Sequence, residues 1–492
     1  MSAAPPILIL QMQRMGDMIL SFPLALWLLR KFPGHPIWMM GEKNFYQGLL
    51  PVAPEITFFP TEALRRLHGR SFHLVLNLSH RPEAAALRQH INCEAWLGPY
   101  ISPEGEMHIT GDWQLYRASL THNNRHNLFH WADLNALDII PYKQWSGTGW
   151  QQAAPVRARG DRVGLFLGAS EADKRPEAAF WAELTRRLLK LGLRPVLLGG
   201  KMERALGHEV ARLAGAPALN LCGRFDLPGL VAFMDNLRLL VTPDTGPMHL
   251  AAWLSLPVLN LSLGPVNAWE TGPYQPGHLI LRSTVSCEGC WQCAKPQVFC
   301  RESFSAPRTA SLIKTMVEHE SQDPSGGPDN APDMSRIGRL VLPGQEIFTT
   351  SRYRGLYDLV APGHTNPPEA TAPECAQRPR LALDRFWQAF FAHSLGLWGK
   401  APLLAARDNL QQILPQLNPP MHKALSSLQA ELARGLKQRP TPLEENFWQK
   451  FPPLLRPLTG YLHMLLQNDN YSLKAYATAL ELVDALRDVT NV

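Results

Sequence analysis

Short apolar runs alternate with amphipathic stretches through the first part of the chain. Residues 7–11 read ILILQ, a helical pattern covers 17–31, and PIWMM follows at 36–40. A shorter helical stretch near Ala63 leads to HLVLNLS at 73–79. Strands that alternate with helices are typical of βαβ units. The pattern therefore predicts a domain built on a parallel sheet, which we place at residues 1–150.

The same alternation returns after a polar stretch at 144–161 that is rich in glycine and proline, as linkers between domains are. The apolar runs of this second part lie at 162–170, 194–200, 237–243 and 257–264. Helical patterns separate them. We therefore predict a second open α/β domain, over residues 161–318.

The chain changes character after residue 318. The polar run ESQDPSGGPDNAPDMS contains three prolines and predicts a flexible linker over 319–336. Residues 337–360 resemble short strands, whereas 382–490 carry apolar residues at spacings of three and four, the helical period. We interpret the aromatic stripe of this helical region as core packing. Residues 337–492 thus form an extension of short strands followed by helices.

Composition narrows the classes of partner. Hydrophobic residues make up 45% of the chain and charged residues 18%, which is ordinary for a globular protein. The net charge of +6 is mild for 492 residues and comes without a block of consecutive Lys and Arg. We therefore expect no nucleic-acid partner and favour an anionic small molecule or contact with an acidic membrane surface.

The start of the chain affects the expected location. It lacks the basic segment of a signal peptide, and its longest apolar run, Met18 to Leu29, is interrupted by Pro23 and falls short of a bilayer span. We therefore expect a cytoplasmic protein, with peripheral contact to the inner face of the membrane left open.

Three polar sites follow predicted strands, at the sheet edge where α/β proteins bind ligands. The first is RMGDMILSFPLALWLL, in which Asp17 stands between an apolar strand and a helix. This aspartate would serve either as a catalytic group or as a simple cap for the free N–H groups of the helix. The local pattern leaves both interpretations open.

The second site is LGASEADKRPEAAFW, where Ser170 and Lys174 precede a helix with Pro176 in its first turn. The free N–H groups and positive end of a helix attract phosphate, and a lysine adds a point charge. A solvated loop lysine is the alternative.

The third site is VTPDTGPMHLAA, a buried strand, a turn and a helix start. Gly246 permits a close approach of backbone to ligand, and Thr245 with its neighbouring N–H groups would hold a diphosphate. Asp244 would accept hydrogen bonds from sugar hydroxyls, and His249 lies in the same helix start. An aspartic protease is excluded because its paired carboxylates need a second such motif, and the chain has none. A capped helix with His249 satisfied in the core stays open.

In this order, the three sites resemble glycosyltransferase family 9, the ADP-heptose heptosyltransferases, over roughly residues 7–305. The most specific stretch is DTGPMHLAAWLSLPVLNLSLGPVNAWETGPY. The resemblance implies a GT-B fold, in which two Rossmann-like domains face a cleft, the first binding the acceptor and the second the nucleotide-sugar donor. It also implies inversion at the anomeric carbon without a catalytic metal.

The resemblance implies specific roles as well. Asp17 matches the general base, and Ser170 and Lys174 match contacts to the donor phosphates. The donor motif for sugar and diphosphate matches Asp244, Thr245, Gly246 and His249.

Two departures from the family pattern concern the donor. Lys174-Arg175-Pro176 lacks the tryptophan that usually precedes the proline, which leaves the placement of the lysine open by one residue. RFDLPG has Pro228 where some heptosyltransferases carry a ribose-binding glutamate, so Asp226 is the candidate for the ribose.

Four cysteines in CEGCWQCAKPQVFC have the spacing C-x2-C-x2-C-x6-C: Cys287, Cys290, Cys293 and Cys300. Four thiolates would close a tetrahedral site for structural Zn or Fe, and free thiols are the alternative. The ferredoxin spacing differs, which disfavours an iron-sulfur cluster. Some protein heptosyltransferases that resemble the family carry an iron there.

The sequence therefore predicts an inverting glycosyltransferase that moves heptose or a related sugar from an ADP-sugar to a hydroxyl of a lipopolysaccharide-type or surface glycan. A protein O-heptosyltransferase of the same family is one alternative. A non-catalytic nucleotide-binding scaffold with a cysteine-bound metal is another.

Overall fold

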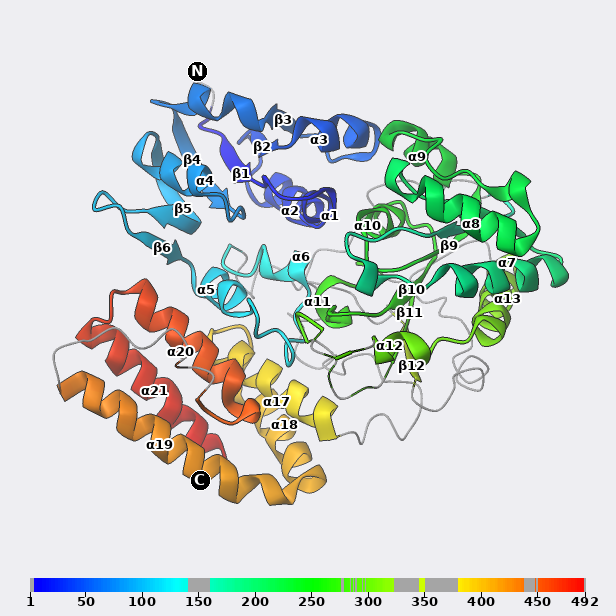
Figure 1. The fold of residues 1–492 in the computed structure, drawn as a ribbon. Helices are drawn as coiled ribbons and strands as arrows, with labels where there is room; N and C mark the ends of the chain where they lie inside the picture. Colours follow the sequence, from blue (N-terminus) through cyan, green and yellow to red (C-terminus); the bar gives the residue numbers. More distant parts are fainter. Residues whose placement is uncertain are drawn as a thin grey trace.

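The computed structural model describes most of the chain. The described residues are 4–139, 160–275, 278–283, 285, 287, 290–293, 295–296, 298–322, 345–349, 379–437, 447 and 450–490. They form two α/β domains and a region of helices (Figure 1). The confirmed fold class is thus α/β with two Rossmann-like domains and a helical C-terminal region.

The N-terminal domain is built on a six-stranded sheet in the order β3-β2-β1-β4-β5-β6, parallel except for β6. Its strands are β1 (Ile7–Leu10), β2 (Ile37–Gly41), β3 (Thr57–Pro60), β4 (Ser71–Asn77), β5 (Asn92–Ile101) and β6 (Met107–Thr110). Its helices are α1 (Met15–Ile19), α2 (Phe22–Lys31), α3 (Lys43–Leu49), α4 (Pro82–Ala86), α5 (Asp112–Ser119) and α6 (Trp131–Leu134). All four residues of β1 are buried, as expected for a central strand covered on both faces.

The helix expected over 17–31 is in fact two helices. α1 ends at Ile19, and α2 begins at Phe22 with Pro23 in its first turn. Proline has no N–H to donate and its ring disfavours a helical interior, so the chain turns between the two. The turn leaves the short α1 alone at the sheet edge, with Asp17 in its first turn.

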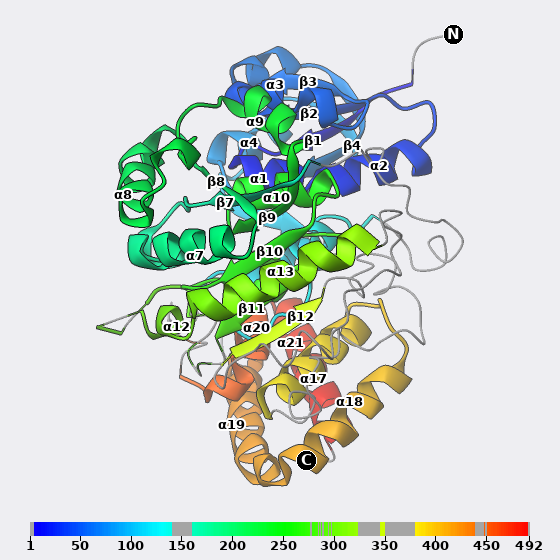
Figure 2. The ribbon, with the colours of Figure 1, turned by 90° about the vertical axis from the view of Figure 1, so that its right-hand side faces the viewer.

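The second α/β domain has a sheet in the order β12-β11-β10-β9-β7-β8, parallel except for β12. Its strands are β7 (Arg162–Phe166), β8 (Arg194–Leu198), β9 (Leu237–Thr242), β10 (Val258–Ser262), β11 (Leu279–Ser283) and β12 (Gln345–Thr349). Its helices are α7 (Ala178–Lys190), α8 (Arg204–Ala214), α9 (Leu227–Met234), α10 (Gly246–Trp253), α11 (Ala268–Thr271), α12 (Phe299–Glu302) and α13 (Ala306–Gln322). Figure 2 shows α13 lying across one face of this sheet.

Two features of this domain differ from the sequence interpretation. α13 runs on to Gln322, beyond the start of the linker expected at 319. β12 belongs to the segment that the sequence assigned to the extension, yet it pairs antiparallel with β11 and adds an edge strand to this sheet. The rest of 337–360, and the linker over 144–159, lie outside the described residues.

The helical region consists of α17 (Pro379–Ser394), α18 (Lys400–Ile413), α19 (Asn418–Lys437), α20 (Arg456–Asn468) and α21 (Leu473–Thr490). The aromatic stripe on α17 is buried, which confirms that it packs a core. This region docks on the N-terminal domain through α20 and α5 (Figure 1). The ring of Phe391 lies 4.7 Å from that of Tyr116 on α5, and His126 contacts Asp384 at 2.6 Å.

None of the helices in the described ranges is both long and apolar enough to cross a lipid bilayer.

Candidate functional site

Both sheets reverse their strand order at one point, and the predicted site residues lie at these points. In the first sheet, β2 and β4 flank β1, so the loops after β1 and β4 diverge and leave a crevice at the carboxyl edge. In the second sheet the same change of direction occurs between β7 and β9. Asp17 follows β1, Lys174 follows β7 and Asp244 follows β9, so the topology places all three where α/β proteins bind ligands.

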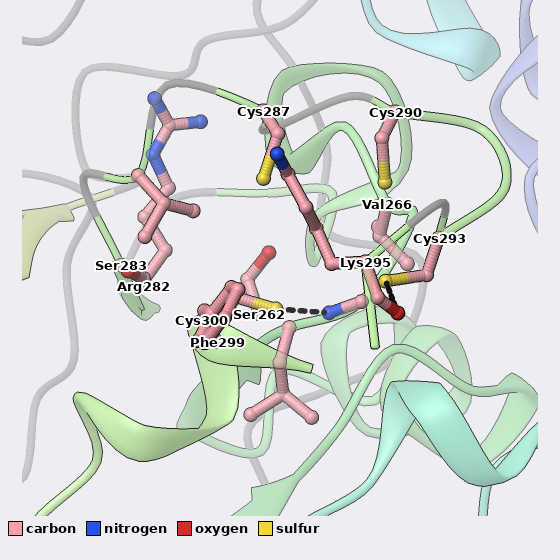
Figure 3. A pocket seen from close by; sticks show the side chains of 13 residues that line it. Ser262, Val266, Arg282, Ser283, Cys287, Cys290, Cys293, Lys295, Phe299 and Cys300 are labelled. Carbon is pink, nitrogen blue, oxygen red and sulfur yellow. Dashed lines mark hydrogen bonds between the residues drawn. The ribbon is translucent and has the colours of Figure 1, made fainter. Parts of the chain in front are cut away.

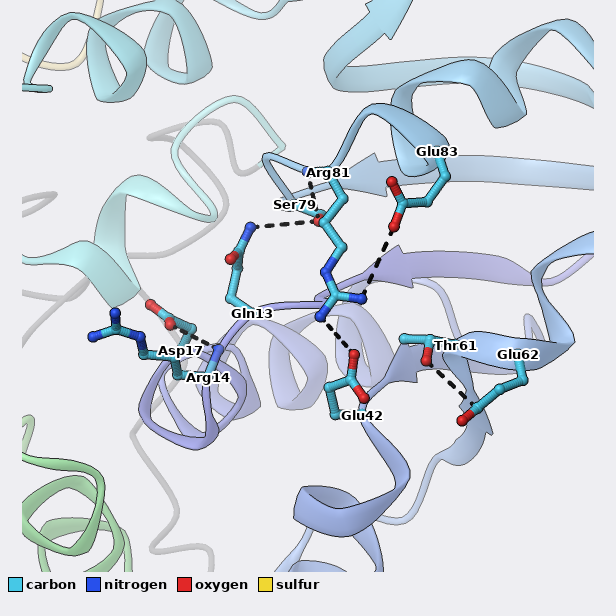
Figure 4. Close-up of polar contacts among 9 residues, drawn as sticks. All are labelled: Gln13, Arg14, Asp17, Glu42, Thr61, Glu62, Ser79, Arg81 and Glu83. Atoms are coloured by element: carbon cyan, nitrogen blue, oxygen red, sulfur yellow. Dashed lines mark hydrogen bonds and ion pairs between the residues drawn. The ribbon is translucent and has the colours of Figure 1, made fainter. Parts of the chain in front are cut away.

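Asp17 lies in the first turn of α1 and bonds the backbone at the start of that helix. Its Oδ2 accepts a hydrogen bond from the backbone N–H of Arg14 at 3.2 Å (Figure 4), and its backbone carbonyl accepts one from Ser21 at 2.9 Å. Burial raises the pKa of the Asp17 carboxyl, against the lowering effects of the Arg14 hydrogen bond and the Arg117 charge. A carboxylate with a raised pKa accepts a proton more readily near neutral pH.

Arg117 is a residue of this edge that the sequence analysis missed. It lies on α5 with only 4% of its surface exposed. Its guanidinium donates to the Leu78 carbonyl at 2.7 Å and to Asn135 at 3.1 Å, and it stacks over the ring of Trp131 at 4.9 Å. A buried arginine with this many partners is held in one orientation. No local motif marked it, because α5 reaches the edge only through the tertiary fold.

The loops after β1, β2 and β4 bring further polar side chains to the same edge (Figure 4). Arg81 pairs with Glu42 at 2.5 Å, and its backbone N–H donates to Ser79 at 3.2 Å. Gln13 lies 3.5 Å from the same serine. Mixed donors and acceptors of this kind suit a polyhydroxylated ligand, and the sequence analysis did not single them out.

The loop after β7 carries Ser170, which is exposed, and Lys174, whose side chain is 17% exposed. Lys174 lies in a short 3₁₀ turn, Ala172–Lys174, and its Nζ is 3.5 Å from Glu171. Its charge also acts on Asp244, for which it lowers the pKa. Lys174 therefore lies close to the third predicted site, and the exposed Ser170 opens onto solvent.

Asp244, Thr245, Gly246 and His249 surround the start of α10. Burial raises the pKa of Asp244 to about 6 despite Lys174, and burial lowers the pKa of His249 to about 3. Among the described residues, no hydrogen-bond partner reaches Oδ1 of Asp244 or Nδ1 of His249, although both atoms are buried. Buried polar atoms normally have partners, so this pair marks a place where a ligand group would bond. The side chain of Thr245, the N-cap residue, makes no capping hydrogen bond.

The two edges meet. A Cβ added at Gly16 would lie 2.9 Å from Cδ2 of His249, and one added at Gly246 would collide with Met15. The Asp17 charge acts on Asp244 and helps to raise its pKa. The helices α1 and α10 thus approach closely, and the predicted base and the predicted donor motif lie next to each other.

A buried polar contact joins the domains beside this site. Asn127 donates to Glu270 on α11 at 3.1 Å, and Asn267 donates to the Asn124 and Asn127 carbonyls at 2.7 and 2.8 Å. Burial raises the pKa of Glu270 to about 7. Hydrogen bonds from Asn127 and Asn124 lower the same pKa, because they stabilise the carboxylate.

Asp226 has a structural role in the fold. Its Oδ1 accepts a hydrogen bond from the backbone N–H of Gly229 at 2.9 Å and so caps α9. The side chain is exposed at the start of α9, where Leu227 packs against Gly48 of α3. Its role toward a ribose stays a prediction.

The four clustered cysteines line one small pocket with Lys295 and Arg282 (Figure 3). None of these four cysteines forms a disulfide. Burial, with the neighbouring Cys287 and Cys293, raises the pKa of Cys290 to about 11. Among the described residues, no three histidine, cysteine, aspartate or glutamate side chains lie close enough together to hold a metal ion. Cysteine sulfur is the donor type that a thiophilic metal prefers, so a metal at this pocket would require the thiols to move closer to one another.

Part of the chain is similar to known proteins. Residues 122–297 match the model of glycosyltransferase family 9 (heptosyltransferase). The chain is 35% identical over 130 residues to a lipopolysaccharide heptosyltransferase 1 of Pseudomonas aeruginosa. The aligned segment covers 26% of this chain and 35% of that protein. It is 25% identical over 167 residues to a lipooligosaccharide heptosyltransferase 2 of Campylobacter jejuni, covering 32% and 51%. The chain thus spans about a third to a half of the length of these relatives.

A solved structure of an Escherichia coli ADP-heptose lipopolysaccharide heptosyltransferase II aligns with 64% of this chain and 99% of its own. The TM-score is 0.47 and the identity 19%.

Two Rossmann-like domains whose carboxyl edges meet are the arrangement that the resemblance implies. The family model over residues 122–297 and the lipopolysaccharide heptosyltransferase 1 support the resemblance to glycosyltransferase family 9 found in the sequence.

Proposed function

We propose that this protein is an inverting glycosyltransferase that transfers heptose, or a related sugar, from an ADP-sugar to a hydroxyl of a lipopolysaccharide-type or other surface glycan. The observation that carries the proposal is the meeting of two sheet edges, with Asp17 on one and the unbonded Oδ1 of Asp244 on the other. A base beside a sugar-binding carboxylate is the arrangement that this transfer needs.

In the proposed reaction, Asp17 takes the proton of the acceptor hydroxyl as its oxygen attacks the anomeric carbon. The bond from that carbon to the diphosphate oxygen breaks, and ADP leaves with the electron pair. Attack opposite the leaving group inverts the anomeric configuration. Burial favours this role, because it raises the pKa of Asp17.

The donor side would stabilise the departing diphosphate. Lys174 supplies a positive charge, and the N-terminus of α10 at Thr245 and Gly246 supplies backbone N–H groups. Asp244 and His249 would bond the sugar with the atoms that lack partners within the described chain. Ser170 would contact the phosphates from the loop edge. No metal takes part in these steps.

The cysteine pocket would hold a structural Zn or Fe. Cys287, Cys290, Cys293 and Cys300 would supply the thiolates. Such a metal would tie the loop after β11 to the donor domain. The group would contribute rigidity and no chemistry to transfer.

A protein O-heptosyltransferase is the second candidate, because the helical region docks beside the edge that would bind the acceptor. A surface built next to that edge would suit a folded protein acceptor as well as a glycan. Transfer assays on glycan and on protein acceptors, read by mass, separate the two.

The first test is thermal stabilisation by ADP, ADP-heptose, UDP-glucose and GDP-mannose. A ligand at 100 times its dissociation constant adds about 2.7 kcal/mol of stability. We expect a shift with ADP and ADP-heptose, and loss of transfer with retained donor binding in Asp17→Ala. Stabilisation by no nucleotide contradicts the proposal. Donor binding without turnover, together with stable recovered partners, favours a non-catalytic scaffold.

A further inference from the structure

The short helix α12 lies between the cysteine pocket and the two loops of the proposed donor site. Its Cys300 accepts a hydrogen bond from the backbone N–H of Gly264 at 3.2 Å (Figure 3). Gly264 has a φ of 75°, and a Cβ there would lie 2.6 Å from the Asp173 carbonyl oxygen and 3.2 Å from Cα of Lys174. The loop after β10 thus presses directly on the loop that carries Lys174, and Cys300 holds it there.

Arg301, the next residue of α12, contacts the loop that carries Lys174. Arg301 donates from Nη2 to the Ala172 carbonyl at 3.0 Å and pairs through Nη1 with Glu177 at 2.9 Å. These two partners lie on either side of Lys174 in the sequence. A guanidinium that bonds two points at once fixes the loop in a way that a single contact does not. Two adjacent side chains therefore hold both loops of the donor edge.

We propose that Cys300 and Arg301 are positioning residues for the donor site, and that through them the cysteine pocket is energetically linked to nucleotide binding. The inference rests on the proposed function, since it concerns the same donor edge. Neither residue needs to touch the donor. They act by keeping Lys174 and the loop after β10 in the geometry that receives a diphosphate.

The link between the cysteine pocket and nucleotide binding follows from Cys300, which lines the pocket and also contacts the loop after β10. A metal held by the four thiolates would restrain Cys300 and, with it, α12 and both loops. Thermodynamic linkage then requires equal effects in both directions: metal tightens nucleotide binding by the factor by which nucleotide tightens metal binding. Zn²⁺ serves as the probe because it binds thiolates without redox chemistry.

The experiment measures ADP affinity of the full chain by calorimetry. We expect Arg301→Gln to weaken ADP about fivefold or more, with Arg301→Lys partly restoring it and Cys300→Ser weakening it as well. The matched controls are Arg308→Gln, an exposed arginine of the neighbouring α13, and Cys93→Ser, a free cysteine of the other domain. Both controls should bind ADP as the wild type does. Unchanged affinity in Arg301→Gln and Cys300→Ser overturns the positioning role.

Hydrogen exchange provides a readout that needs no nucleotide. Peptides covering 170–177 and 263–267 should exchange faster in Arg301→Gln than in the wild type, while the rest of the domain is unaltered. If the wild type binds no ADP, the proposed function fails and this comparison alone decides the positioning role. Equal exchange in the two proteins overturns it.

The link to the pocket is tested by adding one equivalent of Zn²⁺. ADP should bind more tightly to the zinc-loaded wild type, Zn²⁺ should bind more tightly in the presence of ADP by the same factor, and Cys300→Ser should lose both effects. ADP affinity that is indifferent to bound zinc overturns the link.

Discussion

The two sheet edges that meet in this protein share a topology and differ in what supports them. The N-terminal edge is supported by α5. The charge of its buried Arg117 acts on Asp17, and its Tyr116 packs against Phe391 of the helical region. The donor edge is supported by α12 and the cysteine pocket. The two α/β domains have similar folds, so the electrostatics and rigidity of each edge depend on the segments that pack against it.

The largest expected effect is a loss of transfer that distinguishes the N-terminal edge from the donor edge. Asp17→Asn should reduce transfer by about 10²- to 10⁴-fold, the usual contribution of a general base, while ADP affinity stays that of the wild type. Initial rates and calorimetry measure the two quantities. Asp488→Asn, an exposed aspartate on α21, should leave both unchanged. Loss of ADP binding together with activity would show that Asp17 belongs to the donor side.

The second prediction removes the support behind the N-terminal edge. Phe391 is 1% exposed and packs on Tyr116 and Tyr461. Phe391→Ala should lower the free energy of unfolding by roughly 3–5 kcal/mol, since the surroundings would not collapse into the space of the ring. Denaturant titration measures the change. Leu473→Ala, at a side chain 57% exposed, should cost no more than about 0.5 kcal/mol. Similar losses in both variants would mean that the helical region adds little to this edge.

The third prediction concerns the charge behind Asp17. Transfer needs the Asp17 carboxylate, so its rate falls as the pH drops through the pKa of that group. Four charged or titratable groups lie around Asp17. Arg14 and Arg117 lower the pKa of Asp17. Asp244 is a neighbouring acid, and burial lowers the pKa of His249 so that it stays neutral.

Arg117→Gln removes one of the two cations. The acid limb of the pH-rate profile should therefore move to higher pH, with Arg117→Lys moving it back toward the wild type. An unmoved limb would show that Arg117 serves packing alone.

The smallest expected effect concerns the buried polar contact between the two domains, to which Glu270 belongs. Glu270 has a pKa raised by burial from 4.5 to about 7, so the folded protein favours its protonated form. Its contribution to stability is present below the ordinary glutamate pKa and is lost as the pH rises through about 7. Glu270→Gln stays neutral, so its Tm should fall less than that of the wild type across this window.

Glu209→Gln, an exposed glutamate on α8, should follow the wild type. Parallel pH dependence of Tm in wild type and Glu270→Gln would contradict the raised pKa.

The residues alone are enough to predict the alternating pattern of both α/β domains, the helical character of 382–490 and the three loops that carry Asp17, Lys174 and Asp244. These are local properties, because the hydrophobic period and the position of a loop depend on residues that are neighbours in the sequence. The turn between α1 and α2 was also readable in principle from Pro23, although the apolar run concealed it.

Which of these loops meet depends on the tertiary structure. Gly16 and His249 are 233 positions apart, and the charge of Arg117 acts on Asp17 from a helix that no motif marked. The pairing of β12 with β11 and the hold of Arg301 on Ala172 likewise depend on contacts between distant segments. Such contacts follow from the packing of whole elements, and the side chains that make them carry no local periodicity by which they could be recognised.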